Sequence, residues 1–419
     1  MNLPQQAIIL CGGLGSRLRP LTENMPKPMA PVNGKPFLHY LIQQIRDQGI
    51  RRILLLTGYR GEMIQEYFGA GEKLDVEIAY SSGPLEWDTG RRLWEARRQM
   101  KPNFMLFYSD NFVQFNLHRL WRLHLQHATP ISMLLALKEK GNIRVSQAGK
   151  IEAYDKSRSG EGFDNVEIGY MIVERDRVLA GFPDCSGFPD FNFSTLLEKY
   201  AKEAKIAGLV VRDPYHSISD MKRLQLTCDY MRHKKILLID RDGTINRKAP
   251  RGEYIARWDM FEWMPDTLEA MKNLSKDGFK FIIITNQAGI ARKMIEPEEL
   301  VYIHMKMIEK LAAEGVTVLK VYMSPHHWDE DSFNRKPSPG MFFKASQEFN
   351  LRMDRCLYVG DDERDCIAAA NAGCGMLYLS EDGKDPELDE YPKPYFRAKS
   401  LRECLALIGQ VYREWEALS

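Results

Sequence analysis

Short runs of consecutive apolar residues alternate with amphipathic segments through most of the chain. Two of these runs stand out because each leads directly into a turn rich in glycine or aspartate. Residues 7–10 precede the segment 11–15, and residues 236–239 precede the segment 240–243. Uninterrupted apolar runs of this length are typical of strands that are buried on both faces of a parallel sheet. The pattern therefore predicts two buried strands, each followed by a loop suited to chemistry.

Further strands and helices follow each of these two strands. In the first half the pattern predicts helices at residues 37–48 and 62–68 and strands at residues 52–57 and 76–80. In the second half it predicts helices at residues 266–277 and 297–314 and strands at residues 279–285 and 357–359. Strand–helix alternation is typical of α/β domains with parallel, doubly wound sheets.

The restart of this pattern near residue 236 predicts a second domain. We place the boundary in the basic stretch 231–235, which divides the chain into domains 1–232 and 233–419. A length of 419 residues fits two or three domains.

Composition excludes several classes of protein. The net charge of +1 argues against a nucleic-acid partner and an anionic membrane surface. The chain has no apolar run of the roughly 18–20 residues that a membrane span needs, and its polar start is unlike a signal peptide. The seven cysteines contain no pair spaced for a metal or redox motif, so we expect reduced thiols and a cytoplasmic location. The sequence leaves open whether the chain forms a homo-oligomer.

The first loop has the features of a phosphate-binding turn. Glycines directly after a buried strand let backbone N–H groups approach an anion closely, and Arg17 and Lys27 supply positive charge. A dinucleotide-binding fingerprint would need a third glycine where Leu18 stands, and a Walker loop would need a Gly-Lys-Ser/Thr ending that is missing.

The string from Gly12 to Pro28 resembles the signature of the sugar-phosphate nucleotidyltransferases at every fixed position. That resemblance implies a Rossmann-like nucleotide-diphospho-sugar transferase domain over about residues 6–230. It also implies that Arg17 and Lys27 act in catalysis, with Lys27 close to the reacting phosphates. The nucleoside triphosphate would be held by the loop residues Leu10, Gly12, Gly13 and Gly15.

The same resemblance predicts magnesium ligands in the first domain. Asp110 ends an apolar strand, where the family has an aspartate that binds Mg²⁺ at the α-phosphate. A metal is needed there because the reaction brings two anions together. A second family aspartate is replaced by Ser217, and Asp220 is the candidate substitute.

The match loosens at the base and sugar pockets. Residues 84–90 resemble the loop on the base and sugar side but carry three extra residues, which gives Thr89 and Gly90 as candidate binding residues. Lys156, Glu167 and Gly169 occupy positions that contact the sugar phosphate in the family. The basic pairs Arg91-Arg92 and Arg97-Arg98 could face substrate, a partner subunit or solvent, and of these we expect solvent.

The second loop carries two aspartates, Asp240 and Asp242, that can divide the work of phosphate hydrolysis. One carboxylate can attack phosphorus, while the other protonates the leaving oxygen and then activates water. Mg²⁺ would screen their charge from the phosphate. Further polar residues follow later strands or lie in the loops after them, and the carboxyl ends of parallel strands meet in one crevice. These candidates are Thr285, Asn286, Arg335, Lys336 and Asp361.

These motifs resemble, in order, those of the haloacid dehalogenase superfamily, and in detail its heptose-bisphosphate and histidinol-phosphate phosphatase branch. The resemblance implies a capless Rossmannoid domain in which Asp240 is the nucleophile and Asp242 the acid/base. It places Asp361 on Mg²⁺ together with Asp240 and the backbone of Asp242. Thr285 and Lys336 would bind phosphate. Asp362 and Asp365 are further metal candidates, although we expect them to cap a helix or form ion pairs.

The branch often holds a structural zinc, and this sequence departs from its ligand set. Ser324, His326, Ser332 and Asn334 stand at the four ligand positions, so only the histidine is kept. Thiolates are the ligands that matter most at such a site, and we predict that this chain binds no zinc.

The two resemblances together imply a multifunctional enzyme of nucleotide-sugar biosynthesis. The phosphatase would convert D-glycero-D-manno-heptose 1,7-bisphosphate to the 1-phosphate, and the nucleotidyltransferase would join that product to GTP, giving GDP-heptose and pyrophosphate. Two alternatives stay open. The same fusion could act on another sugar, a cyclitol or a polyol phosphate with CTP, or the first domain could bind nucleotide without turnover because of Ser217.

Overall fold

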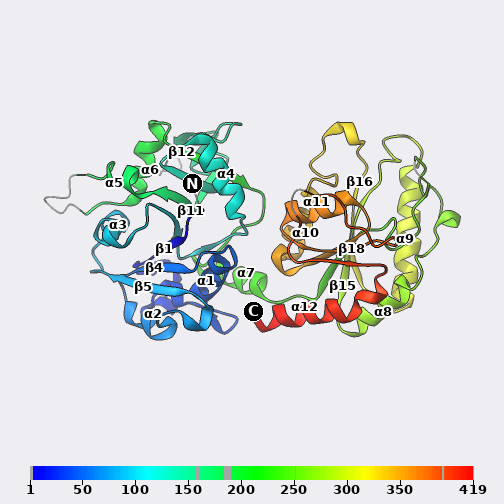
Figure 1. Cartoon of the computed structure of the whole chain (residues 1–419), viewed down its shortest axis with the longest axis horizontal. Coiled ribbons are helices and arrows are strands. Elements are labelled where there is room, and N and C mark those ends of the chain that lie inside the picture. The colour runs from blue at the N-terminus through cyan, green and yellow to red at the C-terminus, as the bar shows by residue number, and fades with distance from the viewer. Residues whose placement is uncertain (1–2, 156–160, 184–189, 251, 389–390, 419) are drawn as a thin grey trace. The chain divides into compact units, whose positions relative to one another are not determined.

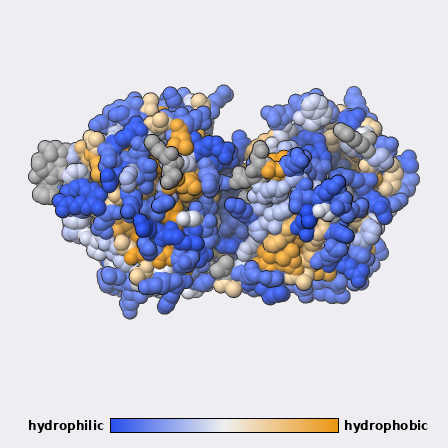
Figure 2. All heavy atoms as spheres, in the orientation of Figure 1, coloured by the Kyte–Doolittle hydropathy of each residue, from blue (hydrophilic) through white to orange (hydrophobic). Residues whose placement is uncertain are grey.

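The computed structural model describes residues 3–155, 161–183, 190–250, 252–388 and 391–418. The chain divides into two compact units, Met1–Asp229 and Tyr230–Ser419, and each is an α/β domain (Figure 1). Within the described ranges, no helix is long and apolar enough to cross a membrane. Hydrophilic residues cover most of the face drawn in Figure 2.

Four parallel strands form one half of the sheet in unit 1. Strand β1 (Gln6–Cys11) lies between β4 (Arg52–Thr57) and β6 (Asn103–Tyr108), and β5 (Glu77–Ser82) extends the sheet beyond β4. All four were predicted as strands, since each carries a run of apolar residues.

The other half of this sheet contains antiparallel strands. Strand β11 (Asn165–Glu174) runs antiparallel to β6 and to β8 (Ile131–Leu137), and β12 (Ile206–Val211) is parallel to β8. The short strands β9 (Ile143–Val145) and β10 (Ile151–Tyr154) complete the edge. The α/β class is confirmed, and the four strands predicted in this unit are parallel, whereas the antiparallel strands β8 and β11 were not predicted. Nearly all residues of β11 are buried, so its apolar pattern does not reveal strand direction.

Helices cover both faces of the sheet in unit 1. Alternate residues of β1 point to opposite faces. Ala7, Ile9 and Cys11 pack in one cluster with α1 (Phe37–Asp47), α2 (Gly61–Phe68) and α4 (Leu117–His127). Ile8 and Leu10 pack in another with α3 (Thr89–Ala96), α5 (Arg175–Leu179) and α6 (Phe193–Lys202). The carboxyl end of β1 is therefore fixed from both sides, which positions the glycine loop.

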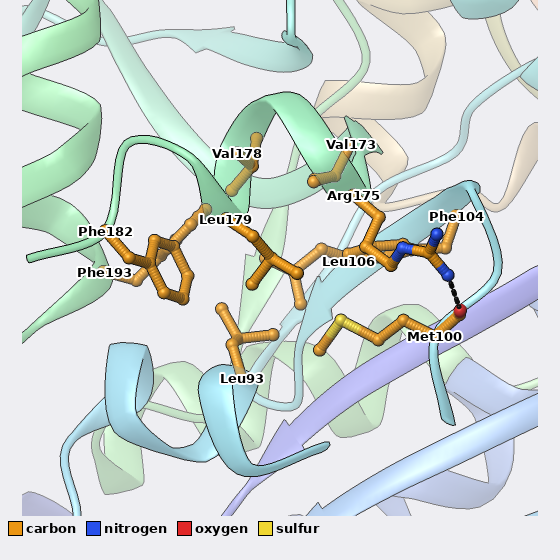
Figure 3. A pocket seen from close by; sticks show the side chains of 10 residues that line it. All are labelled: Leu93, Met100, Phe104, Leu106, Val173, Arg175, Val178, Leu179, Phe182 and Phe193. Carbon is orange, nitrogen blue, oxygen red and sulfur yellow. Dashed lines mark hydrogen bonds between the residues drawn. The ribbon is translucent and has the colours of Figure 1, made fainter. Parts of the chain in front are cut away.

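A small apolar cavity lies in the second of these clusters (Figure 3). Its lining comes from α3, β6, β11, α5 and α6, and Arg175 is its one charged residue. Arg175 Nη1 donates to the carbonyl oxygen of Met100 at 2.9 Å. Because the lining is otherwise apolar, the cavity is a gap in the packing and not a phosphate site.

Unit 2 contains a six-stranded parallel sheet in the order β16-β15-β14-β17-β18-β19. The strands are β14 (Ile236–Ile239), β15 (Lys280–Asn286), β16 (Val318–Ser324), β17 (Leu357–Gly360), β18 (Gly375–Leu379) and β19 (Tyr395–Ala398). Helices α8 (Thr267–Lys276), α9 (Pro297–Ala313) and α12 (Leu405–Leu418) cover one face, and α10 (Gly340–Phe349) and α11 (Glu363–Ala372) cover the other. Because β14 lies between β15 and β17, the loops after these three strands meet at one edge of the sheet.

Candidate active sites

The glycine loop of unit 1 is shaped by close contact with the segment that carries Lys27. Gly15 has a left-handed backbone (φ 63°), and a Cβ added to it would lie 2.7 Å from Lys27 Cβ. Thr22 Oγ1 donates to the carbonyl oxygen of Gly15 at 2.9 Å. Glycine is required at position 15 both for the backbone conformation and for the space. Arg17, on the one-turn 3₁₀ helix Ser16–Leu18, is exposed.

Lys27 and Asp110 form an ion pair beside this loop. Lys27 Nζ lies 2.6 Å from Asp110 Oδ2, and both side chains are partly buried. Ser109 Oγ donates to the carbonyl oxygen of Leu10 at 2.6 Å, which ties the residues after β6 to the end of β1. The structure thus brings together the glycine loop, a lysine and an aspartate, as the sequence predicted.

The segment of β11 that carries the predicted sugar-side residues Glu167 and Gly169 passes beside the end of β6, where Asn111 Nδ2 donates to the carbonyl oxygen of Ile168 at 3.2 Å. A Cβ at Gly169 (φ 73°) would overlap the ring of Tyr108, so this glycine allows β11 to pass close to β6. The pKa of Tyr108 is raised by burial and, to a smaller extent, by the negative charges of Glu167 and Asp110, among others. Lys156 lies outside the described residues.

Asp220 also lies near Asp110 in the fold, but its carboxylate is engaged with its own helix. Strand β13 (His216–Ser217) pairs with β7 (Asn111–Phe112), and Ile218 N donates to the carbonyl oxygen of Asp110 at 3.0 Å. Asp220 Oδ1 accepts from Arg223 N at 2.9 Å, which caps α7 (Met221–Met231). The role of Asp220 as a metal ligand stays a prediction.

Ser217 is buried beside this capping interaction. Its Oγ accepts from Arg223 Nη1 at 3.1 Å. The arginine therefore contacts the side chain that stands where the family has an acid.

Thr89 and Gly90 begin α3, and both contact the segment 190–193. Thr89 Oγ1 accepts from Phe193 N at 2.9 Å, and Gly90 N donates to the carbonyl oxygen of Phe191 at 3.0 Å. These contacts fix the position of the loop 84–88.

The expectation that Arg91 and Arg92 face solvent is wrong, because their relative exposures are only 7% and 5%. Arg92 Nη1 donates to the carbonyl oxygen of Thr57 at 2.7 Å, and its Nη2 donates to that of Pro84 at 2.7 Å. A Cβ at Gly12 would overlap the Arg92 guanidinium. Arg92 therefore supports the glycine loop and the loop 84–88 together, a role that its charge concealed in the sequence.

In unit 2, Lys336 joins two buried carboxylates. Its Nζ lies 2.8 Å from Asp240 Oδ1 and 2.7 Å from Asp365 Oδ1. Burial raises the pKa of Asp240 to about 8, since the opposing charge of Lys336 is partly offset by Asp365 and Asp361. A bound cation would favour the charged carboxylate that nucleophilic attack requires.

Asp242 has a different environment from Asp240. Its Oδ1 accepts from Arg241 Nη2 at 2.9 Å and from Asn246 Nδ2 at 3.0 Å, and its Oδ2 accepts from Gln287 Nε2 at 2.7 Å. Burial alone would raise the pKa of Asp242, but Arg241 and these hydrogen bonds outweigh it and lower the pKa. A nucleophile must be ionised and a general acid protonated, so in the absence of a bound cation these two pKa shifts run opposite to the roles that the motifs assign to Asp240 and Asp242.

Of the remaining predicted residues of this site, two lie beside the aspartates and two contact the backbone of other loop residues. Thr285 and Lys336 are buried beside the aspartates, and Thr285 Oγ1 accepts from Gln287 Nε2 at 2.8 Å. Asn286 instead exchanges two 3.0 Å hydrogen bonds with the backbone of Lys336. Arg335 Nη1 donates to the carbonyl oxygen of His326 at 3.1 Å. Asn286 therefore positions Lys336, a contact across 50 residues that the sequence did not reveal.

The geometry at Asp361 fits a divalent cation. Asp240, Asp361 and Asp365 offer oxygens that all lie within 4.8 Å of one another, and no other group of three was found in the described ranges. Asp361 Oδ1 is buried and lacks a hydrogen-bond donor among the described residues. Lys248 Nζ lies 2.7 Å from Asp361 Oδ2. Clustered carboxylate oxygens are the ligands that Mg²⁺ prefers.

Asp365 also has the structural roles that were expected. It accepts from Asp362 N at 3.2 Å at the start of α11, and Asp362 caps the same helix. His326 is the one histidine at the four positions where the phosphatase branch has zinc ligands. Its Nδ1 lies 2.8 Å from Glu330 Oε2.

Gly243 tests whether the position of Asp361 matters. We expect Gly243→Ala to lower phosphatase kcat by about 10- to 10²-fold, because its Cβ would overlap the Asp361 carboxylate. Gly252→Ala is the matched control, since Gly252 has nearly the same φ (91° against 89°) and a Cβ there would meet no described atom within 4 Å. Equal losses in the two variants, measured as phosphate release, would show that backbone strain alone is responsible.

Comparisons with known proteins agree with this division of chemistry. The nucleotidyl transferase family profile matches residues 6–158, and the polynucleotide kinase 3 phosphatase profile matches residues 235–373. Over 212 residues, the chain is 31% identical to the D-glycero-alpha-D-manno-heptose 1-phosphate guanylyltransferase of Aneurinibacillus thermoaerophilus, covering 49% of this chain and 89% of that relative. Over 155 residues, it is 36% identical to the D-glycero-beta-D-manno-heptose-1,7-bisphosphate 7-phosphatase of Yersinia pestis, covering 35% of this chain and 81% of that relative.

Among solved structures, the chain is similar to the D,D-heptose 1,7-bisphosphate phosphatase of B. bronchiseptica, which was crystallised with magnesium and phosphate. The identity is 28% and the TM-score 0.38, covering 43% of this chain and 99% of that one. The aligned regions include 89% of the guanylyltransferase relative and 81% of the phosphatase relative, at identities of 31% and 36%. The chain therefore belongs to the nucleotidyl transferases through its first unit and to the haloacid dehalogenase-like phosphatases through its second.

Proposed function

We propose that this chain carries out two consecutive steps of nucleotide-heptose synthesis. Unit 2 removes the 7-phosphate of D-glycero-D-manno-heptose 1,7-bisphosphate, and unit 1 joins the remaining heptose 1-phosphate to GTP, releasing pyrophosphate. The observation that carries the proposal is the pairing of relatives in one chain. The reaction named for the phosphatase relative leaves a heptose 1-phosphate, and the guanylyltransferase relative is named for a heptose 1-phosphate that differs from it only in the anomer.

In unit 2, Asp240 attacks the 7-phosphorus and the bond to the sugar oxygen breaks, which leaves a phosphoryl group on the carboxylate. Asp242 gives a proton to the departing sugar oxygen and then takes one from the water that releases phosphate. Lys336 and Thr285 hold the phosphate oxygens. Mg²⁺ held by Asp240, Asp361 and the backbone of Asp242 would supply charge screening between the nucleophile and the phosphate.

In unit 1, an oxygen of the sugar 1-phosphate attacks the α-phosphorus of GTP, and pyrophosphate leaves. Backbone N–H groups of the glycine loop and the Arg17 guanidinium hold the triphosphate. Lys27 balances the charge that develops around the reacting phosphorus. Asp110, with Asp220 as the second candidate, would hold Mg²⁺, which lowers the repulsion between the two phosphates.

The anomer is the point on which the two relatives differ, since the guanylyltransferase name specifies alpha and the phosphatase name beta. Hydrolysis at C7 leaves C1 unchanged, so the two steps are consecutive only if both units accept the same anomer. We propose the alpha anomer, because unit 1 reacts at the phosphate on C1, whereas the reaction of unit 2 takes place at the far end of the sugar.

The test is to incubate the full chain and Mg²⁺ with each anomer of the bisphosphate and follow the reaction by ³¹P NMR. We expect the 7-phosphate signal of the alpha anomer to be replaced by inorganic phosphate while its 1-phosphate signal remains. Added GTP should then convert that signal to a diphosphate. Loss of the 1-phosphate, or no reaction of either anomer, would overturn the substrate assignment.

A further inference from the structure

Arg241, which lies between Asp240 and Asp242 in the sequence, is a fully buried cation. Its relative exposure is 1%. Its Nη2 donates to Asp242 Oδ1 at 2.9 Å and to Gln287 Oε1 at 3.2 Å. Its Nε has no acceptor among the described residues. The orientation of this guanidinium therefore depends on the few acceptors that it does reach.

His304 supplies one of these acceptors from a distant part of the chain. It lies on α9, 63 residues after Arg241, and its Nε2 is 3.0 Å from Arg241 Nη1. The neighbouring residues Ile303 and Met307 pack into the core cluster that includes β14, which fixes the helix. An arginine can only donate, so His304 Nε2 accepts and the ring proton is on Nδ1. Burial and the charge of Arg241 lower the pKa of His304 to about 3, which keeps the ring neutral.

We propose that His304 is a positioning residue for Asp242: it orients the Arg241 guanidinium, which in turn orients the carboxylate toward the leaving oxygen of the substrate. The inference rests on the phosphatase function proposed above and adds a residue that the sequence analysis did not single out. Without His304, the buried Nη1 loses its acceptor, and a buried unsatisfied donor costs free energy. The guanidinium then shifts, and the hydrogen bond to Asp242 is no longer fixed.

The effect should depend on the leaving group, and this distinguishes positioning from a general structural defect. A sugar alkoxide is a strong base and needs a proton as it leaves, whereas p-nitrophenolate leaves without one. The ratio kcat/KM reports only steps up to departure of the leaving group, so the later hydrolysis of the aspartyl phosphate does not obscure the comparison.

The variants are His304→Leu, which removes the acceptor, and His304→Gln, whose amide oxygen can replace it. Glu309→Leu, at an exposed position of the same helix, controls for leucine in α9. We expect His304→Leu to lower kcat/KM for the heptose bisphosphate by about 10²-fold and that for p-nitrophenyl phosphate by less than about 3-fold. His304→Gln should have a kcat/KM for the heptose bisphosphate that is at least about a third of the unmodified value.

If His304→Leu lowers kcat/KM equally for the two phosphate esters, or does not lower it for the heptose bisphosphate, His304 does not position Asp242. If the unmodified protein releases phosphate from neither ester, the phosphatase function itself fails, and this outcome is distinct from the failure of the inference. Thermal unfolding of each variant shows whether the unit is still folded.

Discussion

Asp240→Asn should abolish phosphate release, with a loss of at least about 10⁴-fold in kcat, while guanylyl transfer to added heptose 1-phosphate continues at the unmodified rate. The amide cannot act as the nucleophile, and hydrolysis needs the aspartyl intermediate. The fold should tolerate the change, because asparagine has the same shape and Lys336 keeps its 2.7 Å contact with Asp365. The substitution also removes one of three crowded carboxylates, so the free energy of unfolding should not decrease.

The measurement is a pair of assays on the same preparation, one for inorganic phosphate from the bisphosphate and one for pyrophosphate from GTP and heptose 1-phosphate. Asp259→Asn is the matched control, since Asp259 is exposed and pairs only with Arg257 among the interactions that the structure describes. Loss of both activities in Asp240→Asn would indicate that the two sites are coupled. Substantial remaining phosphate release would remove Asp240 as the nucleophile.

Lys27→Ala should have the opposite pattern, lowering kcat/KM for guanylyl transfer by about 10²- to 10³-fold and leaving phosphate release unchanged. The ammonium group is held against Asp110 at 2.6 Å, beside the loop that would bind the triphosphate. Removing it takes away a positive charge where negative charge develops on the transferred phosphorus. Asp110 is partly exposed, so leaving it unpaired should cost no more than about 1 kcal/mol of stability.

This variant is checked with saturating heptose 1-phosphate and a range of GTP concentrations. Lys73→Ala, at an exposed position of the same unit, is the matched control and should leave both activities unchanged. A normal kcat/KM in Lys27→Ala would contradict the placement of the reacting phosphates near the glycine loop.

The strands at the centre of each sheet could be predicted from the sequence, because a short continuous apolar run that ends in a glycine- or aspartate-rich turn is typical of a buried strand. Residues 52–57 and 236–239 are strands with the predicted limits. The direction of β11 could not be predicted, since a strand buried on both faces has the same pattern in either orientation. The strand ends brought Asp110 to the glycine loop, and Asp240 and Asp361 to each other, because parallel strands place their carboxyl ends at one edge.

Contacts between side chains that are far apart in the sequence could not be predicted in this way. Arg92 looked like a solvent-facing charge, yet it donates to the backbone carbonyl of Thr57, and its guanidinium lies against Gly12. Asn286 looked like a phosphate ligand, yet the nitrogen and the oxygen of its side-chain amide both contact the backbone of Lys336. A motif shows which residue types are present, whereas burial and hydrogen-bond partners arise only in the folded chain.

The central claim is that one chain performs both reactions in sequence on one sugar. The most direct test is to incubate the full chain with the alpha anomer of heptose 1,7-bisphosphate, Mg²⁺ and each of the four nucleoside triphosphates in separate reactions, followed by mass analysis. We predict GDP-heptose in the GTP reaction, together with one phosphate and one pyrophosphate for each sugar converted. Unchanged bisphosphate in all four reactions, or heptose 1-phosphate that accumulates without any nucleotide sugar, would contradict this account.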